Sequence, residues 1–135
     1  MAYYRQEDKK EVAPKINAIL KQYGVKGSLS IQHNSMLVLT IHSGGIDFIA
    51  NADDCAKVKA TRYDHQYYPI KDSIEVNIYH TGSNFSGIAL ECLDKLITTM
   101  NEGNYNNSDV QTDYFDVGFY VAIKIGKWDK PYKLN

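Results

Sequence analysis

The feature that most constrains the fold is an alternating segment near the C-terminus. Between residues 118 and 125, the apolar side chains occupy every second position: Phe119, Val121, Ile123 and Ile125. Successive side chains of a β-strand point to opposite faces of the sheet, so these four share one face. The pattern therefore predicts a closing strand that is apolar on one side, with a hydrophobic layer packed against it.

A helix predicted over residues 85–102 supplies such a layer. Ser83 or Ser86 would cap its N-terminus, and Gly103 would end it. Its apolar residues recur at helical spacing and form one stripe: Phe85, Ala89, Cys92, Leu93, Leu96, Ile97 and Met100. We expect the stripe to pack on a sheet face that carries Leu39, Ile41, Val76, Ile78, Val121 and Ile123.

The first helix is predicted from about Asp8 to Tyr23, followed by Gly24 as a left-handed stop. Pro14 implies either a start close to residue 13 or a kink. Further strands are predicted over 28–33 and 36–42, joined by a tight turn at 34–35, and over 46–49 and 74–80. Residues 51–72 indicate a short helical turn and a long, exposed aromatic connection, and 104–112 indicate a polar loop.

This order of elements, α-β-β-β-β-α-β, predicts a single α+β domain spanning residues 1–135. Its sheet would be mostly antiparallel, with two helices packed on one face. A chain of this length, with 44% hydrophobic residues, can bury a core of its own.

The net charge of −1 gives the chain no overall field that would attract DNA or an anionic membrane. Four lysines near the C-terminus have two possible roles. They form a local basic patch, or they are solvated residues that keep an exposed edge strand from pairing with another chain: Lys124, Lys127, Lys130 and Lys133. No apolar run reaches membrane-spanning length, and Cys55 and Cys92 do not form a CxxC motif. We therefore expect a cytoplasmic protein with no membrane partner.

Two histidines are the best candidates for catalysis, because His42 and His80 are each expected at a strand end and each precede a hydroxyl residue. Neighbouring strands that end in this way are typical of two-histidine phosphodiesterases, in which one imidazole is the base and the other the acid. In those enzymes, however, the hydroxyl follows two residues after the histidine, on the same strand face. Histidines with a structural role are the simpler interpretation. The aspartates, including Asp53, Asp54 and Asp64, lack metal-ligand spacing, so neither a metal nor a cofactor is expected.

Aromatic residues outside the alternating core positions are the candidates for contact with a partner. Tyrosine, tryptophan and arginine dominate interface energetics, and base stacking on the same rings is an alternative. A third interpretation is that the rings cover the core. The predicted partner-binding residues are Arg62, Tyr63, Tyr67, Tyr68, Tyr114, Trp128 and Tyr132.

Several short motifs resemble those of a known family. A helix precedes Val25-Lys-Gly-Ser-Leu-Ser-Ile-Gln-His33, and Ile41-His-Ser-Gly-Gly-Ile-Asp-Phe48 follows it. Phe85-Ser-Gly87 and Phe115-Asp-Val-Gly118 come later in the chain. This arrangement resembles the large polyvalent protein-associated domains of bacteriophages and mobile elements, a family without established catalytic residues.

The resemblance implies a phage or mobile-element product that acts in the cytosol of a bacterial host. The expected function is non-enzymatic: an accessory protein that binds and inhibits a bacterial target, for example an antiviral defence component such as CRISPR–Cas. The alternatives are a nucleic-acid-binding module and a small phosphodiesterase or hydrolase that uses His42 and His80.

Overall fold

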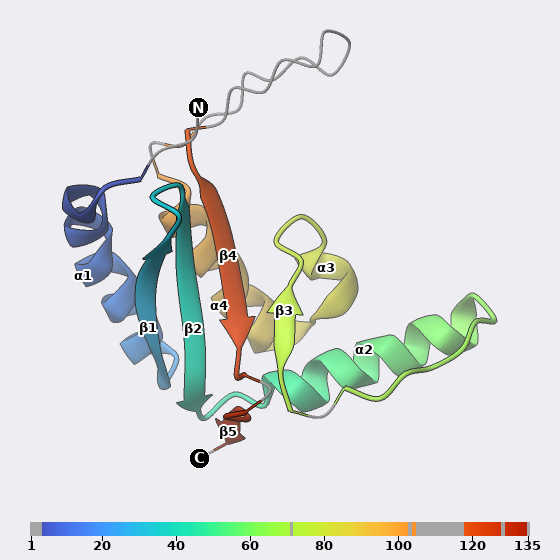
Figure 1. Ribbon diagram of the computed structural model, residues 1–135. Coiled ribbons are helices and arrows are strands. Elements are labelled where there is room, and N and C mark those ends of the chain that lie inside the picture. The colour runs from blue at the N-terminus through green and yellow to red at the C-terminus, as the bar shows by residue number, and fades with distance from the viewer. Residues whose placement is uncertain (1–3, 71, 103, 105–117, 128, 135) are drawn as a thin grey trace, which may run out of the picture.

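The structure is a computed structural model that describes residues 4–70, 72–102, 104, 118–127 and 129–134 (Figure 1). The helices and strands in these ranges are α1 (Gln6–Gln22), β1 (Val25–Gln32), β2 (Met36–Gly44), α2 (Phe48–Arg62), β3 (Ile74–Val76), α3 (Thr81–Asn84), α4 (Gly87–Met100), β4 (Tyr120–Ile125) and β5 (Lys133–Leu134). They form an α+β fold, as the sequence predicts.

The sheet has the strand order β1-β2-β4-β3, and the short β5 also pairs with β2. Antiparallel pairing joins β1 to β2 through the long hairpin and joins β3 to β4, whereas β4 and β5 run parallel to β2. The mainly antiparallel character is as predicted. The sheet is not a simple meander, because β4 is parallel to β2. The chain returns to the sheet only after α4, and β4 then lies between β2 and β3.

The core lies between one face of the sheet and the helices α1 and α4. Leu37, Leu39 and Ile41 of β2 are fully buried, and Ile123 and Ile125 of β4 lie beside them. The α4 stripe packs on this face: Ala89, Cys92, Leu93, Leu96 and Met100 are buried, and Ile97 packs against them. The layer of α1 and α4 on one sheet face confirms the predicted architecture.

The first helix begins earlier than predicted and continues through Pro14 to Gln22. A start close to residue 13 is therefore wrong. Gly24 follows the helix with φ +67°, a left-handed conformation that glycine adopts at little cost, so the predicted stop is confirmed.

The strand predicted over 46–49 is wrong, because α2 begins there. The Asp47 side chain accepts a hydrogen bond from the Ala50 backbone N–H at 2.9 Å and so caps the helix, and Phe48 enters the core. The predicted short helical turn is in fact the 15-residue helix α2.

Two other strand boundaries also differ from the prediction. The strand predicted over 74–80 ends at Val76, where the Asn77 side chain accepts the Tyr79 N–H at 3.1 Å and turns the chain toward α3. The hairpin turn is centred one residue earlier than predicted, on His33 and Asn34, both with φ 54°.

Candidate functional site

The most prominent feature outside the core is a projection that we call the arm, residues 53–70. Figure 1 shows α2 extending away from the sheet beyond β3, with the chain then running back alongside the helix. This return segment, residues 63–70, has no helix or strand of its own. The arm thus contains the long, exposed aromatic connection that the sequence predicts. It is built on a helix, α2, of which the sequence predicts only a short turn.

The carboxylate of Asp53 ties the return segment to α2. Its Oδ1 accepts hydrogen bonds from the Tyr67 hydroxyl and, at 3.1 Å, from the Ile70 backbone N–H. Lys57 on the next turn of α2 lies 3.5 Å from its Oδ2. These contacts hold the return segment in a defined position although it belongs to no helix or strand.

The same contacts shift the pKa values of both side chains. The Tyr67 hydroxyl donates to Asp53 and, with the Ile70 amide, stabilises the charged carboxylate, which lowers the pKa of Asp53. Conversely, the carboxylate holds the phenolic proton and raises the pKa of Tyr67 to about 12. At neutral pH, therefore, the hydroxyl is a donor and the carboxylate an acceptor.

The arm presents two aromatic rings to solvent. Tyr63 is 65% exposed and lines the outer side of α2 next to Arg62, the exposed last residue of the helix. Tyr68 is 71% exposed and lies on the return segment, on the side that faces β3. The Tyr63 ring lies nearly parallel to the His65 ring, with 6.4 Å between the centroids. Four of the predicted contact residues therefore lie on one projection, but Tyr67 is half-buried and serves mainly to hold the arm together.

Tyr132 is not a surface residue, and its predicted role as a partner contact is wrong. It is buried at 9% exposure, its ring meets Phe48 edge-on at 5.7 Å, and its hydroxyl donates to the Ile46 carbonyl at 2.5 Å. Burial raises its pKa to about 12. It covers the core. Tyr114 and Trp128 lie outside the described residues.

Two of the concave surfaces on the described residues lie between α2 and other parts of the chain. The inner cleft, about 360 Å³, lies between the arm and β3, and its floor is apolar: Ala52, Ala56, Ile74, Val76 and Phe85. The outer groove, about 510 Å³, lies between the other face of α2 and the residues around α3: Asp54, Cys55, Val58, Lys59, Arg62, Tyr63, Gly82, Ser83 and Ser86. Lys59 borders both hollows, and its ammonium group donates to the Asn84 side chain.

The two histidines do not form a catalytic pair. β4 separates β2 from β3, so the prediction of neighbouring strands is wrong. His42 follows Ile41, which pairs with Ile125 at the C-terminal end of β4. β3 is antiparallel to β4, and its last residue, Val76, pairs with Ile123. From Val76 the chain therefore runs toward the N-terminal end of β4 before it reaches His80. His42 instead bonds the Ser28 hydroxyl at 3.0 Å on an exposed part of the sheet. The structure gives each histidine a separate, local setting.

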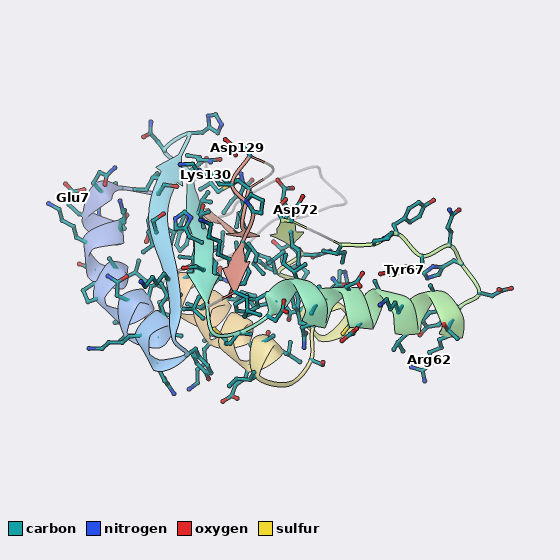
Figure 2. All side chains as sticks on the ribbon, turned by 90° about the horizontal axis from the view of Figure 1, so that it is seen from below. Glu7, Arg62, Tyr67, Asp72, Asp129 and Lys130 are labelled. Atoms are coloured by element: carbon teal, nitrogen blue, oxygen red, sulfur yellow. The ribbon has the colours of Figure 1, made fainter. Side chains whose placement is uncertain are left out.

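The C-terminal lysines and the arm lie on different parts of the molecule. Lys127 and Lys130 exchange backbone hydrogen bonds across a turn that follows β4. Figure 2 shows Lys130 on the body of the protein, well away from Arg62 at the end of α2. The aromatic arm and the lysines therefore do not form one continuous basic surface.

Within the described ranges, no group of three histidine, cysteine or acidic residues is placed to hold a metal ion. Nor does any helix in these ranges have the length and hydropathy needed to cross a membrane.

Comparison with known proteins gives no relative: no family model, no curated protein and no solved structure matches this chain.

The outer groove is the part of the site that the sequence reasoning missed. Because the sequence indicates only a short helical turn at the start of residues 51–72, Val58 and Lys59 are not among the predicted contact residues. A signal was nevertheless present, since Asp54, Val58 and Arg62 recur every four residues and share one helix face.

Proposed function

We propose that this protein is a non-catalytic accessory protein of a phage or mobile element that binds and inhibits a bacterial host protein through its arm. The target class that we propose is an antiviral defence component, such as a CRISPR–Cas protein, in the host cytosol. The resemblance to large polyvalent protein-associated domains supplies this biological setting.

The single observation that carries the proposal is the pair of exposed tyrosines on a projecting, internally tied arm. Tyr63 and Tyr68 are 65% and 71% exposed, so two large rings remain in contact with water in the free protein. A partner that covered them would gain the favourable free energy of burying them. The Asp53 contacts hold the return segment before any partner arrives, so less ordering entropy is lost on binding.

Arg62 strengthens the same interpretation. Tyrosine and arginine are the side chains most often found at interface hot spots, and here they are adjacent at the end of one helix. Arg62 and Tyr63 line the outer groove and Tyr68 lines the inner cleft, so partner side chains that contact these residues could also fill the two hollows.

The test uses the tagged protein expressed in bacteria that carry an active defence system. The wild-type protein should restore plating of a restricted phage and should capture one host protein reproducibly. A double variant with Tyr63→Ala and Tyr68→Ala should lose both effects. Both variant and wild type should give the same unfolding midpoint, since the two rings are exposed.

Tyr79→Ala is the matched control, because Tyr79 is 83% exposed but lies after β3 rather than on the arm. It should behave as the wild type in both assays. The proposal is wrong if the double variant retains capture and plating, or if the control loses them equally.

A further inference from the structure

The outer groove has an uneven distribution of charge along one face of α2. Lys59 and Arg62 are its two cations, and Asp54 is its only acid among the described lining residues. Asp54 precedes Arg62 by two helical turns, or about 12 Å along the axis, so it does not neutralise the end of the helix. Within the described residues, Arg62 has no ion-pair partner. The positive end of the groove is thus open to a ligand.

The remaining walls combine apolar area with hydroxyl groups. Val58 is 63% exposed and Tyr63 is 65% exposed, and both line the groove. Ser83 and Ser86 on the opposite wall contribute hydroxyls. Cations and hydroxyls can donate hydrogen bonds to a carboxylate, while the valine and the tyrosine can contact an apolar side chain beside it.

We propose that the outer groove binds an acidic segment of the protein partner, in which carboxylates meet Arg62 and Lys59 and a neighbouring apolar side chain meets Val58 and Tyr63. The inference rests on the proposed function and gives the partner a chemistry. Charge complementarity selects the occupant: the groove is positive at its outer end, so a basic segment would be repelled.

A protein segment fits this groove better than a nucleic acid does. Phosphate-dominated binding needs several cations along a backbone track, whereas the groove offers two cations and carries the carboxylate of Asp54 in the same hollow. Lys57, which lies near the groove on α2, is paired with Asp53. Lys130 lies on a different part of the molecule (Figure 2).

The experiment follows amide chemical shifts of the ¹⁵N-labelled full chain with three probes. These are a peptide of alternating glutamate and leucine, a peptide of alternating glutamine and leucine, and an oligothymidylate. The acidic peptide should shift amides of Lys59, Arg62, Ser83 and Ser86, and the effect should weaken as salt rises from about 50 mM to about 200 mM. The glutamine peptide should give little shift at the same concentration.

Charge reversal makes the test specific. Arg62→Glu should weaken binding of the acidic peptide about tenfold, because an attractive ion pair becomes a repulsive one. Lys10→Glu is the matched control: Lys10 is exposed on α1, on the opposite side of the molecule from the arm (Figure 1), and its reversal should change binding little.

The inference is overturned if the acidic peptide shifts residues outside the groove, if both peptides bind equally, or if the oligothymidylate binds the groove more tightly. These outcomes are separable from failure of the proposed function. An Arg62→Glu variant that still captures the host protein, while the Tyr63→Ala and Tyr68→Ala double variant does not, would refute the acidic segment and keep the arm.

Discussion

Leu96→Ala is the sharpest test of the layered core. Leu96 has no exposed surface and lies in the α4 stripe that packs on the sheet. The substitution removes three buried carbon atoms, which at about 0.8 kcal/mol each amounts to about 2.4 kcal/mol of transfer free energy. The cavity left behind adds a further cost, so the free energy of unfolding should fall by about 3–5 kcal/mol.

Urea denaturation followed by circular dichroism measures this change, provided that the slope with denaturant stays constant. Ile88→Ala is a matched control, because Ile88 lies on the same helix but is 57% exposed. Its cost should stay within about 0.5 kcal/mol, apart from the small difference in helix propensity. A Leu96→Ala cost below about 0.5 kcal/mol, or one equal to that of Ile88→Ala, would refute the packing of α4 on the sheet.

Four further predictions concern particular residues. Gly126→Ala should destabilise the protein by at least about 1 kcal/mol in the same assay, because φ is +69° there and an added Cβ would lie 2.6 Å from a backbone nitrogen. Asp53→Ala should lower the pKa of Tyr67 from about 12 toward its ordinary value near 10 in a spectrophotometric titration. Since the pKa of Asp53 is itself lowered, its carboxylate should keep its hydrogen bonds to Tyr67 and Ile70 at neutral pH and lose them only below about pH 4. Hydrogen exchange of the Ile70 amide, which is slowed while its hydrogen bond is present, measures this loss. His42→Gln and His80→Gln should each leave inhibition of the host target intact; loss of inhibition in both, with unchanged melting temperatures, would support catalysis instead.

The parts of the fold that the sequence predicts correctly carry a periodic apolar signal. β4 alternates and α4 has an unbroken stripe, because each buries one face in the core. The strand predicted at 46–49 failed because Ile46 and Phe48 alternate around Asp47 in the manner of a strand. The cap that Asp47 provides to the Ala50 amide is a local signal that competes with this alternation.

The arm was predicted in part, and the reason lies in its surroundings. Beyond Ala52, α2 leaves the core, so no apolar stripe marks it as a helix. Its aromatic connection was still recognisable, since Tyr63 and Tyr68 occur in a polar stretch without periodicity. Tyr132 looked similar, yet its contact with Phe48 joins residues far apart in the chain, which no local pattern indicates.

The central claim, that the arm is the contact surface, is tested most directly by the affinity of the captured host protein for arm variants in calorimetric titration. Tyr63→Ala or Tyr68→Ala should cost at least about 2 kcal/mol of binding free energy and leave the free energy of unfolding unchanged. Tyr79→Ala should bind as the wild type. Wild-type affinity in both arm variants would contradict the claim and place the interface elsewhere on the molecule.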